Sequence, residues 1–311
     1  GKGESPRPEL LNKRLLGPFT MYHLIILLSI VVLPLYAYLL KHKWILDYYI
    51  LYPLGFLFIG YMIYQAVVRQ RLESNRIIVF LILFFFSLMF WAFFEQGDTS
   101  LGLFVEKNLD RNIFGYKLES GVFQSLNPLY IVVFAPVMGW LWKVLAERDK
   151  DPSTPFKMGV GVSLNGLAFL TFAASIYFAD SQGIVPLYFY LIAYMIITIG
   201  ELCLYPLSLS LVSKIAPQDL KGLMMGGWML SIAFSHSVAA LIANMTTGKN
   251  GAALFGIEAL ASYCSVYKQI GLIALFAGIG LALFSRKLAS MMALEKTEPN
   301  GSEFDLEKKS N

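Results

Sequence analysis

The sequence predicts an all-α polytopic membrane protein, and composition gives the first reason. Of its 311 residues, 57% are hydrophobic and only 15% are charged, whereas soluble domains carry about 25% charged residues. The second reason is that the apolar residues form long continuous runs, and crossing a bilayer as a helix takes about 20 such residues. Strands of a membrane β-barrel instead alternate apolar and polar residues over about ten positions, so the continuous runs exclude a barrel.

The runs define eight predicted spans. We expect them at about 21–40, 45–67, 77–96, 121–145, 156–178, 185–212, 222–244 and 269–290. Most of the 25 Lys and Arg residues fall on one side of these spans, the side that also holds both ends of the chain. Because the cytoplasmic side carries the excess of Lys and Arg, both termini are predicted to be cytoplasmic. The opening GKGESPRPEL has neither Met nor an apolar signal region, so we interpret it as a linker within a longer protein.

The few cysteines and histidines narrow the chemistry. Cys203 falls inside a predicted span and Cys264 outside the spans, so no disulfide is expected between them. The three histidines, His23, His42 and His236, are scattered along the chain, whereas a membrane enzyme would need a metal or nucleophile cluster. His236 is interpreted as a helix-packing residue rather than a proton relay. We therefore predict that the protein is not an enzyme.

Two acidic residues lie inside predicted spans: Glu95 near the outer end of the third span, and Glu201 within the sixth. Ionisable residues inside a membrane are costly and face a partner or a water-filled cavity. Helical periodicity places other polar residues on the face of Glu201. This stripe consists of Thr198, Glu201, Tyr205 and Ser208.

Two further spans carry polar faces of the same kind. Gln124 and Asn127 share one face at the start of the fourth span, and the seventh span presents a stripe made of Met224, Trp228, Ser231 and Ser235. We predict that these faces surround a water-filled central cavity. Structural alternatives stay open: Glu95 at the membrane interface, Asn127 capping a kink before a proline, Trp228 in ordinary packing, and Glu201 bonded to a neighbouring helix.

Four segments in order resemble the C-terminal half of the proton-coupled oligopeptide transporter (POT) family of the major facilitator superfamily. They are FWAFFEQGDTSLGLFVEKNLDR, GVFQSLNPLYIVVFAPVMGWLW, PSTPFKMGVG and GELCLYPLSLSLVSKIAPQDLKGLMMGGWML, and they extend from about Phe90 to Leu230. The resemblance implies an extra transmembrane hairpin at 21–67 and the C-terminal six-helix transport bundle at 77–290. A cytoplasmic linker (1–20), a cytoplasmic connector (68–76) and a disordered cytoplasmic tail (291–311) complete the predicted organisation.

The resemblance also implies roles for individual residues. Glu201 matches the glutamate that receives the amino terminus of the peptide, and Asn127 and Trp228 match residues of the peptide pocket. Glu95 matches a glutamate of proton-coupled gating that pairs with an arginine of the N-terminal bundle. Three neighbours on the same faces join the predicted substrate site: Gln124, Tyr205 and Ser231.

The chain departs from the family pattern at one position of this site. After the sixth-span glutamate the family usually shows Ser-Pro-x-Gly, and this chain has Tyr205, Pro206, Leu207 and Ser208 instead. A tyrosine one turn from Glu201 would narrow the pocket and offer the carboxylate a hydroxyl partner. The N-terminal ExxER motif of the family does not occur in this sequence, so the resemblance implies an N-terminal six-helix bundle as partner.

The implied activity is proton-coupled symport of di- and tripeptides by alternating access in the bacterial inner membrane. It requires no cofactor, because the proton gradient drives it. Its partners are small peptides, protons and the lipid bilayer, and no nucleic acid. A carboxylate in a dry cavity favours its protonated form, and an arriving ammonium favours the charged form, so binding and proton release are coupled. A major-facilitator transporter of nitrate, sugar or a drug is the main alternative, and a channel or structural subunit is a more distant one.

Overall fold

The computed structural model describes residues 14–16, 19–247 and 254–292. Within these residues, eight helices are long and apolar enough to cross a membrane, and the only strands form two short antiparallel pairs. The predicted all-α membrane fold is therefore confirmed. Most of the predicted linker 1–20 and of the predicted tail 291–311 lies outside the described residues.

The chain divides into two compact units, Gly1–Leu57 and Phe58–Asn311. The first unit contains, in order, β1 (Arg14–Leu16), β2 (Phe19–Thr20), α2 (Met21–Lys41), α3 (Lys43–Ile45), a π-helical turn (Leu46–Leu51) and the first residues of α4 (Tyr52–Val68). Helix α2 begins at a cap in which the backbone N–H of Thr20 donates to His23 Nδ1 at 3.3 Å. This contact satisfies one of the N–H groups that have no partner inside the helix.

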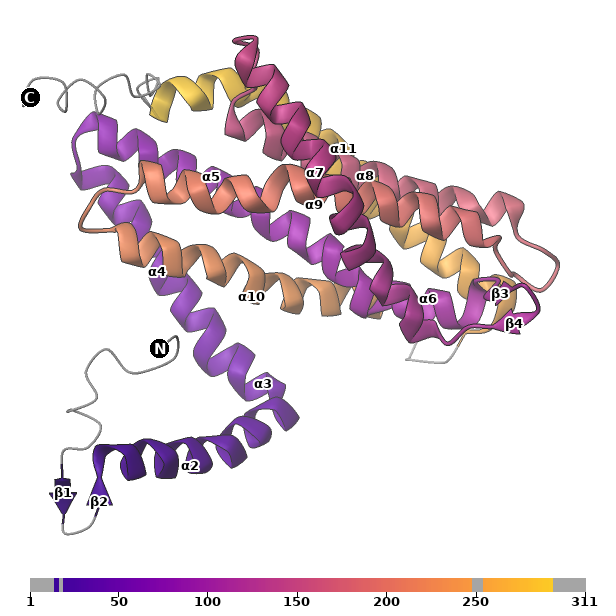
Figure 1. The fold of residues 1–311 in the computed structure, drawn as a ribbon, viewed down its shortest axis with the longest axis horizontal. Helices are drawn as coiled ribbons and strands as arrows, with labels where there is room; N and C mark the ends of the chain where they lie inside the picture. The colour runs from indigo at the N-terminus through magenta and orange to yellow at the C-terminus, as the bar shows by residue number, and fades with distance from the viewer. Residues whose placement is uncertain (1–13, 17–18, 248–253, 293–311) are drawn as a thin grey trace, which may run out of the picture. The chain divides into compact units, whose positions relative to one another are not determined.

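The second unit contains the remainder of α4 and the helices α5 to α11 (Figure 1). In chain order these are α5 (Arg71–Phe94), α6 (Ser100–Asn108), α7 (Leu126–Glu147), α8 (Thr154–Ala174), α9 (Leu187–Ile215), α10 (Lys221–Met245) and α11 (Gly256–Met292). Short 3-10 turns occupy Glu95–Asp98, Ser120–Ser125 and Ser175–Phe178. A hairpin of β3 (Asn112–Ile113) and β4 (Tyr116–Lys117) follows α6.

Two helical segments differ from their predicted limits. The third span does not stop near residue 96, because a 3-10 turn connects α5 directly to α6. The eighth begins at Gly256 instead of residue 269, so Cys264 lies in the same helix as the predicted eighth span. The prediction missed this extension because two charged residues, Glu258 and Lys268, make the segment before residue 269 resemble a loop; both are exposed. The opposite face of this helical extension is buried. Cys203 and Cys264 are both free, as predicted.

Glycines allow the backbone of α8 to come into direct contact with the backbones of α9 and α11. A Cβ placed on Gly166 would lie 2.4 Å from the backbone nitrogen of Leu275 in α11. A Cβ on Gly161 would lie 2.6 Å from the carbonyl oxygen of Gly200 in α9. Small residues at such crossings let membrane helices pack by direct van der Waals contact. This packing fixes α9, which carries Glu201, against α8.

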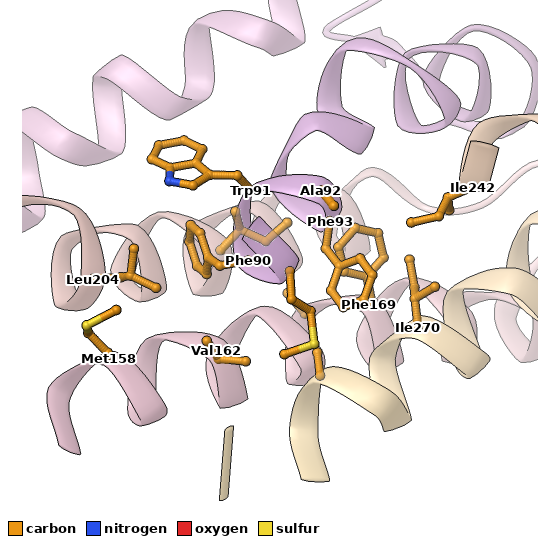
Figure 2. Close-up of a cluster of buried hydrophobic side chains, with 14 of the residues drawn as sticks. Phe90, Trp91, Ala92, Phe93, Met158, Val162, Phe169, Leu204, Ile242 and Ile270 are labelled. Carbon is orange, nitrogen blue, oxygen red and sulfur yellow. The ribbon is translucent and has the colours of Figure 1, made fainter. Parts of the chain in front are cut away.

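Aromatic side chains fill the centre of the second unit. Figure 2 shows Phe90, Trp91 and Phe93 projecting from one turn of α5, with Phe169 of α8 beside Phe93. The ring centroids of Phe93 and Phe169 are 6.3 Å apart. The carbonyl oxygen of Phe90 accepts a 3.0 Å hydrogen bond from buried Asn165 Nδ2. Helix α5 is thus held in register next to the 3-10 turn that carries Glu95.

An arginine fixes the junction between α4 and α5. Arg69 donates to Gln65 Oε1 at 2.7 Å and to Glu73 Oε2 at 2.8 Å. Both amino groups of its guanidinium also donate to the carboxylate of Asp219, which lies in the turn between α9 and α10. The hydrogen bonds from Arg69 hold the pKa of the Asp219 carboxyl below its usual range. Arg69 therefore ties residues far apart in the sequence to one another.

Candidate functional site

The central feature of the site is a hydrogen bond between α7 and α9. Asn127 Nδ2, in the first turn of α7, donates to Glu201 Oε2 at 2.8 Å. The same amide nitrogen lies 3.4 Å from the Thr198 hydroxyl, which itself donates to the backbone carbonyl of Tyr194 at 2.9 Å. Asn127 and Glu201 are both half-buried. The structure therefore brings together two of the residues that the sequence placed in the substrate site.

Tyr205 lies one turn further along α9 and is half-buried. Its ring stands perpendicular to the indole of Trp91 in α5, with centroids 5.3 Å apart. Among the described residues, the hydrogen-bond partner of Glu201 is Asn127, so the expectation that Tyr205 supplies a hydroxyl to Glu201 is wrong. The helical spacing did place both on one side of α9, but the tyrosine ring packs against Trp91 of α5.

Glu95 has a partner that the sequence did not predict. His236 Nδ1, from α10, lies 3.3 Å from Glu95 Oε2. The Glu95 side chain is 15% exposed and the His236 side chain 51% exposed. His236 was interpreted as a packed histidine, yet half of its ring is open. The available signal was that it is the one charged or titratable residue of α10 after Lys221.

Gln96, next to Glu95, is fully buried and joins three elements. Its Nε2 donates to the carbonyl oxygens of Ala92 at 3.0 Å and Ala239 at 3.1 Å. Its Oε1 accepts a 2.7 Å hydrogen bond from the Ser100 hydroxyl. Because Ala239 belongs to α10, this amide fixes the end of α5 against the helix that carries His236. No pattern in the sequence predicted this role of Gln96.

Trp228 and Ser231 lie together on the side of α10 that packs against α5. Trp228 is buried with its ring 5.9 Å from Phe80, and Ser231 is buried with its hydroxyl 3.2 Å from that of Ser87. Met224 and Ser235, the other members of the predicted stripe, are buried as well. The expectation that this stripe borders an open cavity is wrong for this structure, because α5 covers it.

Gln124 is exposed and lies in the 3-10 turn before α7. It borders a cavity of about 360 Å³ together with Asp98, Glu106, Ser120 and Tyr190. The structure thus places Gln124 at a cavity beside the loops, whereas Asn127 contacts Glu201.

Near Glu201 the charged groups of the site are acidic, and the ion pairs of Lys and Arg lie elsewhere. Ion pairs of Lys and Arg among the described residues involve helix ends and loops: Arg69 with Glu73 and Asp219, Lys143 with Glu147, and Lys157 with Asp151. Glu201 has an amide as its partner. Because this partner is neutral, the carboxyl group of Glu201 remains open to a cation that arrives from outside.

Comparison with known proteins places these features in a family. The family model PTR2, described as the POT family, matches residues 40–257. The chain is similar to dipeptide and tripeptide permease B of Yersinia enterocolitica, with 31% identity over 261 residues. That match covers 84% of this chain and 52% of the permease, so the chain spans about half the length of the curated relatives it matches.

Solved structures agree with this match. A crystal structure of peptide transporter POT in complex with sulfate has a TM-score of 0.67 and 29% identity, over 88% of this chain and 54% of the other. A POT family transporter in complex with a thioalcohol conjugated peptide has a TM-score of 0.65 and 25% identity, over 86% and 54% respectively. Since the family model covers well over half of the sequence, the chain belongs to the POT family of transporters.

Proposed function

We propose that this chain is the C-terminal half of a symporter that imports di- and tripeptides with protons by alternating access. Family membership supports the transport of peptides, since the similar proteins include permeases named for dipeptides and tripeptides. The observation that carries the proposal within the chain is the hydrogen bond between Asn127 and Glu201. The proposed location is the bacterial inner membrane, with both ends of this segment cytoplasmic.

The chemistry of this pair suits a peptide amino terminus. Asn127 uses its Nδ2 to hold one oxygen of Glu201, which leaves Asn127 Oδ1 and Glu201 Oε1 as neighbouring acceptors. An ammonium has three N–H donors and no acceptor, so two adjacent oxygens match it well. Charge-assisted hydrogen bonds of this kind are about twice as strong as neutral ones. In the proposed mechanism, the arriving ammonium replaces a proton on Glu201.

The remaining predicted residues enter the proposal as walls of the pocket. Tyr205, held against Trp91, narrows the space beside Glu201 and selects against bulky side chains. Gln124 contacts substrate on its way through the cavity beside the loops. For Trp228 and Ser231, which are buried here, the proposal requires α10 to move away from α5 during the transport cycle.

The positive charge that would bind the peptide carboxylate comes from another part of the transporter. A zwitterionic peptide needs a cation for its carboxylate, and the pocket residues named above supply only acids and neutral groups. We propose that an N-terminal six-helix bundle supplies this cation and closes over the site. Glu95 then takes part in gating, because its charge state decides whether it attracts that bundle.

Uptake into proteoliposomes tests the proposal. The full-length transporter that contains this half should take up a labelled dipeptide when an inward proton gradient is imposed, and unlabelled dipeptides should compete. Glu201→Gln should abolish binding of peptides with a free amino terminus, whereas Glu147→Gln, at an exposed acid in the last turn of α7, should not. Uptake of nitrate, a sugar or a drug in the same assay, without uptake of peptides, would support the alternative major-facilitator function.

A further inference from the structure

We infer that His236 relays the transported proton to Glu95 from the open face of α10. This inference rests on the proposed proton-coupled function and adds a residue to it. Three observations carry it: the 3.3 Å contact between His236 Nδ1 and Glu95 Oε2, the unequal exposure of the two side chains, and the composition of the helix face around His236.

Through its contact with Glu95 and its own exposure, His236 connects the buried carboxyl group to the surface of the protein. Glu95 is 85% covered and is held in place by the adjacent buried amide of Gln96. His236 is half open while one ring nitrogen faces the carboxylate. The imidazole therefore contacts the buried acid on one side and leaves Nε2 for water on the other. Histidine is the side chain whose unperturbed titration lies nearest neutral pH, which suits a group that must both accept and release a proton.

The face of α10 around His236 consists mainly of small residues. At helical spacing this face reads Gly222, Gly226, Met229, Ala233, His236 and Ala240, all exposed or half-buried. The large exposed apolar side chains Leu223 and Leu241 point to a different side of the helix. Lipid would favour large apolar residues around a helix, so the His236 face is better suited to water or to another polypeptide. Protons can reach Nε2 from such a face.

The charged and titratable groups near the pair come from two other elements. The 3-10 turn itself contributes Asp98 beside Glu95. Helix α9 contributes Tyr194, whose hydroxyl lies 3.0 Å from a Cβ placed on Gly97 of the same turn, and two turns further Glu201. Apart from Lys221 at its start, α10 contributes His236 alone. Acids therefore outnumber bases around His236 among the described residues.

The relay conserves protons at each step. Neutral His236 donates its Nδ1–H to the Glu95 carboxylate, and a hydronium ion gives a proton to Nε2, which forms the imidazolium. The Nδ1–H bond then breaks as the Glu95 Oε2–H bond forms. The products are a protonated Glu95 and a neutral His236 that carries its hydrogen on Nε2, so one proton has moved from water to Glu95.

The first test concerns the pair itself and does not depend on the substrate. The infrared carbonyl band of protonated Glu95 is identified as the band lost in Glu95→Gln of the purified full-length transporter. We expect His236→Gln to increase this band at about pH 6, because the ring N–H that stabilises the charged form of the Glu95 carboxylate is gone. His42→Gln, which removes a histidine of the first unit, is the matched control and should leave the band unchanged. An unchanged band in His236→Gln would overturn the inference whatever the protein transports.

The second test concerns the relay. In proteoliposomes, His236→Gln should lower gradient-driven dipeptide uptake by about 100-fold, the lower end of what positioned proton-transfer groups contribute. Counterflow exchange, which needs no net proton movement, should persist within about twofold of the unmodified protein. Gradient-driven uptake that keeps its size and its pH profile in this variant would refute the relay. Lack of peptide uptake by the unmodified transporter would instead refute the proposed function. The infrared result would still show whether His236 affects the protonation of Glu95.

Discussion

Gly166 of α8 and Gly271 of α11 pack backbone against backbone. A Cβ on Gly166 would lie 2.7 Å from the carbonyl oxygen of Gly271, and a Cβ on Gly271 would lie 3.0 Å from that of Gly166. Real Cβ atoms do not approach backbone atoms as closely as a Cβ on Gly166 would, and a Cβ on Gly271 would also be in very tight contact, so a side chain at Gly166 would force the helices apart. This relationship holds α8, and through it α9 with Glu201, in a defined position.

Gly166→Ala should therefore destabilise the protein. The added methyl would also lie 2.4 Å from the backbone nitrogen of Leu275, which cannot turn aside as a side chain could. Overpacking of this kind costs about 1–3 kcal/mol. Gly280→Ala on α11 is the matched control, because nothing lies within 4 Å of its Cβ position. Thermal unfolding in detergent measures both, and equal melting temperatures for the two variants would contradict the close packing.

Asn127→Ala should weaken substrate binding more than it weakens the fold. It removes the donor that holds Glu201 Oε2, and hydrogen bonds to charged groups contribute about 1.5–3 kcal/mol. We expect the half-saturation concentration for a dipeptide to rise by about tenfold to 100-fold in the full-length transporter. Asn112→Ala, in the exposed hairpin after α6, serves as the control. Unchanged half-saturation in Asn127→Ala would show that the pair does not form part of the binding site.

The spans could be predicted from the sequence because a long apolar run has one stable solution in a bilayer. Contacts between spans could be predicted only in part. Helical periodicity placed Trp228 and Ser231 on one face of α10, but it cannot say whether water or α5 covers that face. His236 was misjudged for the same reason: its partner Glu95 lies far away in the sequence, and no pattern along α10 reveals it. The family resemblance named both Asn127 and Glu201 as pocket residues, but it did not predict the hydrogen bond between them.

Gln96→Leu should destabilise the junction of α5, α6 and α10. The leucine has a similar volume but removes the hydrogen bonds of the amide with the carbonyl of Ala239 and the hydroxyl of Ser100, which keeps its contact with Tyr267. Each lost hydrogen bond should cost about 0.5–1.5 kcal/mol. Gln124→Leu, at an exposed position, should leave the melting temperature nearly unchanged. A Gln96→Leu variant as stable as the original protein would mean that water replaces the amide at this junction.

The Arg69–Asp219 contact should make stability depend on pH in the acidic range. Hydrogen bonds from Arg69 lower the pKa of the Asp219 carboxyl below its ordinary value of 3.8. A group with a lowered pKa in the folded state stabilises the fold above its ordinary pKa and loses that contribution as the pH falls through the folded value. The melting temperature of the original protein should therefore fall more steeply below about pH 4 than that of Asp219→Asn. The difference should be small and should shrink in high salt, because Asp219 lies at the surface. If both proteins lost stability in parallel as the pH fell, the acid sensitivity would belong to other carboxylates.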